Sequence, residues 1–217
     1  MFLAKNSMLS TLLKKTRKKA RPLKTGLRIL RSLVRNAVNT LRTSMKKFTG
    51  ASDHHRWSDE TELLVAWDSR TQKIAALVEP GASVIEFGAG RLVLKKFLPA
   101  SCSYTPSDLV DRDGKTLICD LNAYELAPFP PHDVAVFSGV LEYVHDVPRL
   151  ISHLSNCVGV IIASYAVTDF SKINRRGSGW VNDFSSENIL QIFDAFGFSC
   201  NYREVWECQE IYRFTKR

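Results

Sequence analysis

From residue 82 onward, short apolar runs alternate with helical stretches, and this alternation restricts the fold more than any other feature of the chain. The apolar runs predict strands over residues 82–87, 102–105, 116–119, 133–138 and 158–164. The stretches between them predict helices over 91–98, 146–154 and 186–196. Strands that alternate with helices form a mainly parallel sheet covered on both faces. Two last strands, 198–206 and 210–215, follow with a tight turn between them. We therefore predict an α/β, Rossmann-like, doubly wound sheet of seven strands with an antiparallel closing strand.

The first 50 residues differ sharply from the rest in charge. Residues 1–50 hold 14 Lys and Arg and no Asp or Glu, so residues 51–217 carry a net charge of −6 within the total of +8. Pro22 can begin a helix, and apolar residues then recur at steps of three and four as far as Phe48. We therefore divide the chain into a basic amphipathic helical arm, residues 1–50, and a globular domain, residues 51–217.

Four roles are open for this arm. A basic amphipathic helix suits an anionic membrane surface, where apolar residues enter the headgroup boundary and cations face lipid phosphate. The same charge suits RNA, although the arm has few aromatic residues for base stacking. An organelle presequence would also be basic and free of acids, and a solvated arm packed on the domain would need no partner.

Composition excludes several classes of protein. Hydrophobic residues make up 45% and charged residues 24%, as in ordinary globular chains. No run of about 18 apolar residues is present, so no transmembrane helix is expected. The five cysteines lack Cys-x-x-Cys spacing, which argues against a disulfide framework or a metal site. From this cysteine pattern we expect a reducing, cytoplasmic location, with or without membrane association. The oligomeric state is left open.

One helix is expected between the arm and the first strand. Ser58 or Asp59 can cap it, and the sequence Glu-Pro-Gly at 79–81 ends it after Val78. Its apolar face would include Leu63, Leu64 and Trp67. Two histidines, His54 and His55, stand just before it.

The segment 84–90, Val-Ile-Glu-Phe-Gly-Ala-Gly, stands between an apolar run and a helix. Gly88 and Gly90 let the backbone turn sharply and approach a ligand closely. A dinucleotide fingerprint needs a third glycine where this chain has Val93, and the Gly-Lys-Ser/Thr of a phosphate loop is absent. Glu86 would repel a pyrophosphate and attract an ammonium group. The turn therefore favours a cationic nucleoside.

Four segments in order resemble the motifs of the class I S-adenosylmethionine-dependent methyltransferases, and the chain is most similar to the small bacterial-type methyltransferase-domain proteins of the methyltransferase-23 group. These segments are residues 86–90, 104–109, 119–122 and 137–144. The likeness extends over residues 57–217 and implies S-adenosylmethionine as the cofactor.

The resemblance also implies a role for particular residues. The methionine end of the cofactor would be held by Glu86, Gly88, Ala89 and Gly90. Asp108 would bind both ribose hydroxyls, and Asp120, with Leu121 beside it, would bind the adenine. Ser138, at the end of the fourth strand, would lie beneath the cofactor.

The chemistry requires that a nucleophile be held in line with an already electrophilic methyl carbon, so positioning contributes most of the catalysis. A base is needed only where the acceptor must lose a proton. The candidates near the strand ends are His145, Glu142 and Tyr165. In the long loop 169–183, Arg175 and Arg176 can grip a carboxylate or phosphate, and Trp180 can stack on a ring.

The acceptor is expected to be a small molecule, a lipid-linked molecule or a glycan-type molecule, methylated on oxygen or nitrogen. The Asn/Asp-Pro-Pro-Tyr/Phe motif of adenine methylation and the Pro-Cys of cytosine methylation are both absent after the fourth strand. Two alternatives are kept: an RNA methyltransferase that uses the arm for phosphate contacts, and a non-catalytic accessory protein that retains the fold.

Overall fold

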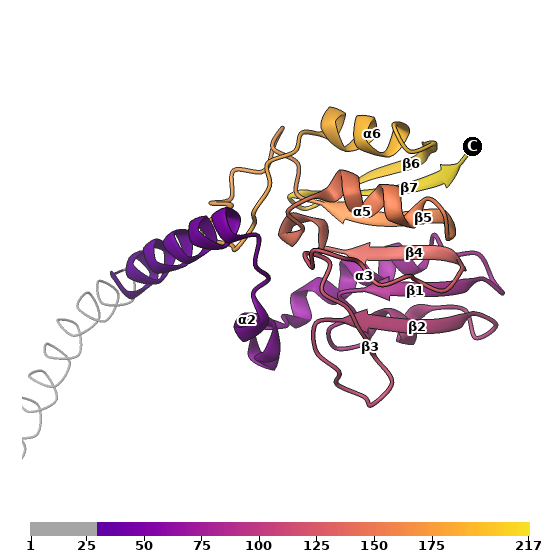
Figure 1. Ribbon diagram of the computed structural model, residues 1–217, viewed down its shortest axis with the longest axis horizontal. Helices are drawn as coiled ribbons and strands as arrows, with labels where there is room; N and C mark the ends of the chain where they lie inside the picture. The colour runs from indigo at the N-terminus through magenta and orange to yellow at the C-terminus, as the bar shows by residue number, and fades with distance from the viewer. Residues whose placement is uncertain (1–29) are drawn as a thin grey trace, which may run out of the picture.

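Seven strands form one sheet in the computed structural model, which describes residues 30–217 (Figure 1). The strands are β1 (Ser83–Phe87), β2 (Ser103–Asp108), β3 (Leu117–Ile118), β4 (His132–Ser138), β5 (Val158–Tyr165), β6 (Phe198–Trp206) and β7 (Gln209–Lys216). Their order in the sheet is β3-β2-β1-β4-β5-β7-β6. The pairs among β1 to β5 are parallel, whereas β7 runs antiparallel to β5 and β6. The predicted Rossmann-like fold is confirmed, and β7, the last strand in sequence, lies inside the sheet rather than at its edge.

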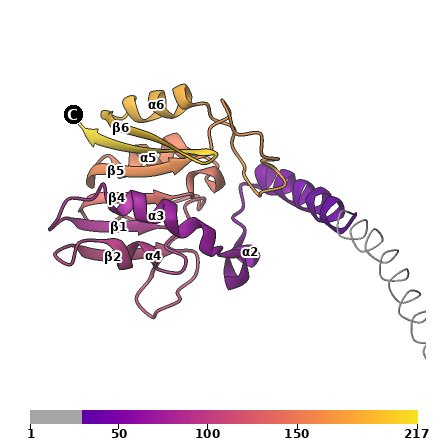
Figure 2. The same cartoon turned by 180° about the vertical axis from the view of Figure 1, so that it is seen from behind.

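Helices cover both faces of the sheet. Besides the N-terminal helix over residues 30–49, the helices are α2 (His54–Ser58), α3 (Asp68–Ala75), α4 (Val93–Phe97), α5 (Val147–Leu154) and α6 (Ser186–Asp194), with 3-10 turns η1 (Glu60–Glu62), η2 (Val65–Trp67) and η3 (Leu141–Tyr143). Figure 1 shows α5 and α6 on the near face, and Figure 2 shows α3 and α4 on the opposite one. Each face has its own apolar core, because β-strand side chains alternate between the two sides.

The single helix expected from Ser58 or Asp59 to Val78 is wrong. The structure divides this segment into η1, η2 and α3. The Asp59 carboxylate accepts hydrogen bonds from the Thr61 backbone N (2.9 Å) and Oγ1 (2.7 Å), which closes a tight 3-10 turn. Leu63 and Leu64 then turn toward a cavity instead of continuing a helical stripe.

Strand β2 runs three residues beyond its predicted end and contains Pro106. The Ser103 backbone N donates to Ala82 O on the β1 side, so the nitrogen at position 106 faces the other edge. There β3 pairs only with Ser107 and Asp108, so no ladder hydrogen bond is lost at the proline.

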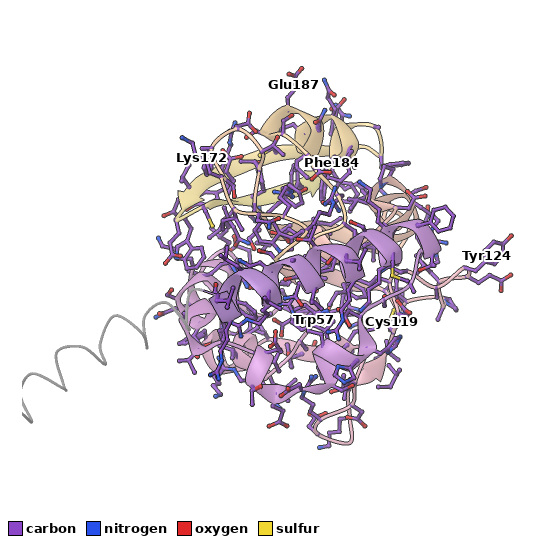
Figure 3. The ribbon with its side chains drawn as sticks, turned by 90° about the vertical axis from the view of Figure 1, so that its left-hand side faces the viewer. Trp57, Cys119, Tyr124, Lys172, Phe184 and Glu187 are labelled. Carbon is purple, nitrogen blue, oxygen red and sulfur yellow. The ribbon has the colours of Figure 1, made fainter. Side chains whose placement is uncertain are left out.

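The N-terminal helix, described over residues 30–49, lies beside the carboxyl ends of the strands (Figure 3). The Asn39 side chain donates to Gly177 O (3.5 Å), and Lys47 Nζ lies 3.6 Å from the Asp183 carboxylate. The predicted helix start at Pro22 lies outside the described residues. Within residues 30–217, no helix has both the length and the apolar character that crossing a bilayer requires.

Candidate functional site

A cavity of about 1370 Å³, counted with its opening to solvent, lies at the carboxyl ends of β1, β2 and β4. Open α/β sheets bind their ligands in this place, where the strand order reverses on either side of β1. The glycine turn after β1 forms its floor, together with the ends of β2 and β4. Its outer wall comes from the linker at 51–53, from Trp57 and from the loop residues 179–181.

The turn after β1 is held tightly against its surroundings. Gly88 has φ +66°, and a Cβ at this position would lie 2.5 Å from Val140 Cγ2. The Gly90 backbone N donates to the Asp108 carboxylate (2.7 Å), and the Ala89 N donates to Ser107 O (3.1 Å). The turn therefore requires glycine for both its backbone angle and its packing. Gly88, Ala89 and Gly90 all line the cavity.

Glu86 places a buried carboxyl group in the cavity wall. It is 3% exposed, and one of its carboxyl oxygens accepts a hydrogen bond from Tyr104 OH. Burial raises the pKa of Glu86 to about 8, because removal from water disfavours the charged form more than the Tyr104 hydrogen bond favours it. The group is therefore mostly protonated at neutral pH until a cation approaches it.

Arg70 of α3 supplies a buried cation to the same cavity. Its guanidinium donates to Ser138 O (3.0 Å), Ser138 Oγ (3.2 Å) and Gln209 Oε1 (2.8 Å). It forms no ion pair within 4 Å with any of residues 30–217, and burial lowers its pKa. A Cβ on Gly139 would lie 2.5 Å from Arg70 Nη1. This unpaired guanidinium is well suited to a carboxylate ligand.

Arg70 is not among the residues predicted from the sequence. The signal that could have found it is its place one helical turn before Ile74, on the buried face of α3. A charged residue on such a face requires a partner.

The two acids predicted for the ribose and the adenine are placed differently. Asp108 lines the cavity at the end of β2. Asp120 is not among the residues that line it, and its predicted contact with the adenine stays a prediction. Its carboxylate accepts from Ser52 Oγ (2.6 Å) and from the Asn122 backbone N (2.9 Å), and lies 3.3 Å from His54 Nε2. Asp120 therefore fastens the linker that follows the N-terminal helix, while Leu121 lines the cavity.

None of the three candidate bases lines the cavity. Glu142 is fully buried, and its Oε1 accepts from the Ala166 N and from Gln209 Nε2, both at 2.9 Å. Tyr165 OH donates to Asn182 Oδ1 (2.5 Å) and accepts from the Phe184 N (3.0 Å). His145 Nε2 lies 3.4 Å from Ala51 O at the surface. Internal hydrogen bonds hold Glu142 Oε1 and Tyr165 OH in the core of the fold, and Glu142 Oε2 is buried without a hydrogen-bond partner among residues 30–217.

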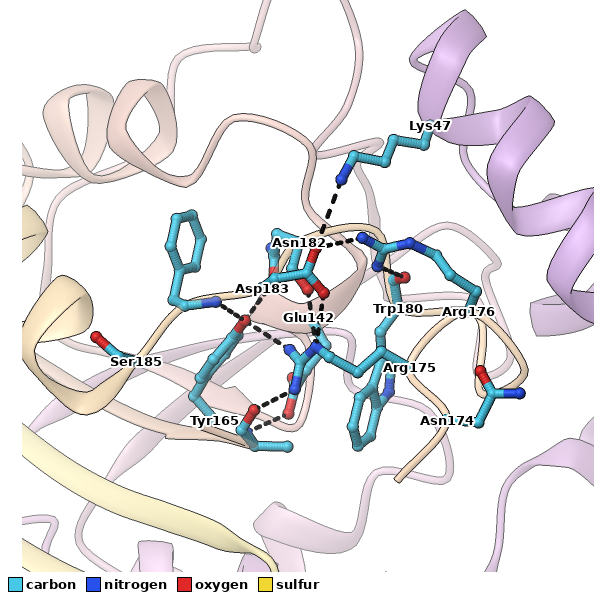
Figure 4. A network of polar contacts seen from close by, with 12 residues as sticks. Lys47, Glu142, Tyr165, Asn174, Arg175, Arg176, Trp180, Asn182, Asp183 and Ser185 are labelled. Atoms are coloured by element: carbon cyan, nitrogen blue, oxygen red, sulfur yellow. Dashed lines mark hydrogen bonds and ion pairs between the residues drawn. The ribbon is translucent and has the colours of Figure 1, made fainter. Parts of the chain in front are cut away.

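The paired arginines belong to a network inside the loop after β5 (Figure 4). Arg175 donates to Tyr165 OH (2.7 Å), Asn182 O (3.0 Å) and Ala166 O (2.5 Å). Arg176 pairs with Asp183 and donates to Trp180 O (2.5 Å). Neither arginine lines the cavity, and the contacts that both make here stabilise the loop; their predicted contact with an acceptor stays a prediction.

Trp180 does line the cavity, and so do Trp57 and Tyr143, which lie beside it. The rings of Trp57 and Tyr143 meet edge to face with centroids 4.9 Å apart, and Trp180 Nε1 donates to Tyr143 OH (3.1 Å). The Arg56 guanidinium lies 4.7 Å from the centroid of Trp57. The three aromatic residues form an aromatic wall that can receive a flat ring.

The cavity fits the amino-acid and nucleoside parts of S-adenosylmethionine. Arg70 suits the carboxylate, and Glu86 suits the ammonium group. The buried Oγ of Ser107 lines the cavity without a hydrogen-bond partner among residues 30–217 and is available to a ligand. The cradle at Gly88, which a Cβ would fill, leaves room for close approach of a ligand.

Comparisons with known proteins agree with this geometry. Residues 55–202, more than half of the chain, match the family described as Methyltransferase domain. Comparison with curated proteins gives no match. Among solved structures, the chain is similar to the mitomycin 7-O-methyltransferase (TM-score 0.62, 12% identity), covering 85% of this chain and 68% of that one.

Two further structures share the fold. The 1,6-didemethyltoxoflavin-N1-methyltransferase of Burkholderia thailandensis, solved with 1,6-didemethyltoxoflavin and S-adenosylhomocysteine, has a TM-score of 0.57 and 18% identity, covering 83% of this chain and 88% of that one. A pyocyanin biosynthetic protein has a TM-score of 0.53 and 13% identity. The match covers 68% of this chain and only 54% of that protein's length. The chain belongs to the methyltransferase-domain family, and the S-adenosylmethionine-dependent methyltransferase class predicted from its motifs is confirmed.

Proposed function

We propose that this protein transfers the methyl group of S-adenosylmethionine to an oxygen or nitrogen atom of a small molecule that carries a flat ring. The observation that carries the proposal is that one cavity contains both the glycine turn and the aromatic wall of Trp57, Tyr143 and Trp180. The cofactor supplies an electrophilic methyl group, so the protein's task is to bind, orient and exclude water.

The residues around the turn divide that task between them. Arg70 holds a carboxylate, and Glu86 releases its proton when it meets an ammonium group. Asp108, at the end of β2, accepts hydrogen bonds from hydroxyls on the nucleoside side. Because Gly90 N already donates to Asp108, the carboxylate is fixed in orientation before a ligand arrives.

The aromatic wall holds the acceptor on the other side. Trp57 and Trp180 come from segments far apart in the sequence, and Tyr143 joins them by one ring contact and one hydrogen bond. Stacking of a ring on such side chains contributes about 1 kcal/mol beyond area burial. The didemethyltoxoflavin enzyme is a solved neighbour whose acceptor was bound in the structure, which supports a small-molecule acceptor here.

Calorimetry with two ligands tests the arrangement. S-adenosylhomocysteine contains the amino-acid part, whereas 5′-methylthioadenosine contains the nucleoside without it. We expect Arg70→Met to weaken S-adenosylhomocysteine binding by about tenfold or more, because a charge-assisted pair is lost, and to leave methylthioadenosine binding within about twofold. Lys73→Met, on the same helix and at a cation that is already paired with Glu204 away from the cavity, is the control.

Equal losses for both ligands would contradict the assignment of Arg70. Transfer of labelled methyl to a panel of aromatic alcohols and amines then tests the acceptor class. Labelling of RNA alone, or of no acceptor at all by a protein that binds the cofactor, would support one of the two alternatives predicted from the sequence.

A further inference from the structure

The N-terminal helix turns its apolar residues away from its own domain. Seven large apolar side chains of this helix are exposed: Leu30, Leu33, Val34, Val38, Leu41, Met45 and Phe48. At about 100° per residue they form one continuous stripe along the helix. Exposed apolar residues that stand singly need no explanation, but a continuous stripe of this kind marks an interaction surface.

The opposite side of the same helix is polar and faces the domain. Thr43 is buried, Asn39 donates to Gly177 O, and Lys46 pairs with Asp53 in the linker. Lys47 reaches the Asp183 carboxylate, a contact shown at the edge of the loop network in Figure 4. The helix is therefore attached by its polar face, which is the reverse of the usual arrangement of a surface helix.

Cations follow one border of the apolar stripe. Arg31, Arg35 and Arg42 project between the stripe and the polar face, and none forms an ion pair with residues 30–217. Residues 1–50 contain no acid that could neutralise them. Two copies of this helix placed stripe to stripe would bring like charges together, which disfavours self-association. An anionic lipid surface can accommodate both the apolar stripe and the unpaired arginines along its border.

We propose that the N-terminal helix binds an anionic bilayer, with its apolar stripe in the headgroup and acyl boundary and its arginines among the lipid phosphates. Apolar burial and electrostatic attraction together provide the affinity, as in other interfacial amphipathic helices. The helix lies in the membrane plane and does not cross it.

This binding would hold the cavity beside the bilayer. Lys46 and the linker residues Ala51, Ser52 and Asp53 connect the helix to the domain and line the cavity. Figure 3 shows the helix lying across this end of the molecule, with Trp57 next to it. An acceptor with an apolar portion would then be delivered from the membrane, a consequence that rests on the proposed function, whereas the binding itself does not.

Vesicle flotation of the full chain tests the proposal. The vesicles are phosphatidylcholine with about 30% phosphatidylglycerol, compared with phosphatidylcholine alone, at about 150 mM and about 500 mM salt. We expect wild-type protein to float with the anionic vesicles at both salt concentrations. Leu41→Ser/Phe48→Ser should weaken the partition constant by about tenfold or more at the higher salt, because two buried apolar side chains are lost.

A matched control is available on the same chain. Tyr124 and Val205 are 92% and 58% exposed, against 93% and 65% for Phe48 and Leu41, and they lie in other elements. Tyr124→Ser/Val205→Ser should float as the wild type does. Arg31→Glu/Arg35→Glu/Arg42→Glu should lose most of its binding at the lower salt.

Three results would overturn the proposal. The first is equal flotation of the apolar double variant and its control. The second is binding of a structured RNA by a wild-type protein that does not float, which would make the arm a nucleic-acid surface. The third is a dimer in light scattering that Leu41→Ser/Phe48→Ser dissolves, with no flotation of the wild type. Calorimetry of cofactor binding does not depend on any of these three results. It therefore distinguishes failure of the membrane proposal from failure of the proposed function.

Discussion

Replacing Glu86 by Gln should remove a large part of the pH dependence of this protein's stability. The folded-state pKa of Glu86 is about 8, against 4.5 for the free group. Between these two values the folded protein binds more protons than the unfolded chain. Stability therefore falls as pH rises through this window, by up to about 1.4 kcal/mol per pH unit.

The magnitude follows from the width of the window. A pKa difference of roughly 3.5 corresponds to about 5 kcal/mol between about pH 4 and pH 9. Gln keeps the shape of the protonated acid but cannot ionise. The variant should therefore match the wild type near pH 5 and exceed it in free energy of unfolding near pH 8.

Urea denaturation at about pH 5, 6, 7 and 8 measures this difference directly. Glu142, whose pKa burial also raises, titrates in both proteins and so cancels from the comparison. Adding S-adenosylhomocysteine should reduce the slope in the wild type, because its ammonium group favours ionised Glu86. Parallel stability curves for the two proteins across this range would refute the reasoning, since Glu86 would then ionise normally.

Three other substitutions, one of them with a control variant, test separate parts of the structure. Gly88→Ala should destabilise the protein by about 1–3 kcal/mol and abolish the thermal shift with S-adenosylhomocysteine, because its Cβ would lie 2.5 Å from Val140 Cγ2. Gly114→Ala, at φ +71° with no atom within 4 Å, isolates the backbone cost of about 1 kcal/mol, and equal effects of the two changes would contradict the packing argument. Arg175→Ala should lower the free energy of unfolding in urea by about 2–4 kcal/mol by leaving buried partners of its guanidinium unpaired, while calorimetry shows unchanged cofactor affinity. Trp57→Leu should raise the acceptor KM in steady-state assays several-fold with little change in cofactor Kd. A change in cofactor Kd alone would show that the Trp57 ring contacts the cofactor instead of the acceptor.

The strand pattern and the glycine turn were predictable because both depend on short-range sequence. Apolar runs of five to eight residues, as at β1 and β5, form buried strands wherever they pair, and Gly88 and Gly90 mark the turn by their backbone freedom alone. The positions of Glu86 and Asp108 beside the turn were predictable as well. Each residue lies at the carboxyl end of a parallel strand, and such ends meet at one edge of the sheet.

The remaining parts of the site depend on which segments meet in space. Asp120 has the local sequence of a cavity residue, yet Ser52 and the linker occupy its carboxylate. Arg175 looks like a free loop cation, but it meets Tyr165 and Asn182 only after the loop has folded back on β5. Arg70 joins Ser138 and Gln209 from three distant elements. The sequence alone determined the sheet and the cofactor turn, because those follow from periodicity and backbone preference. Tertiary structure decided the surroundings of Asp120 and Arg70 and which way the basic helix faces, because these depend on partners more than 60 residues away along the chain.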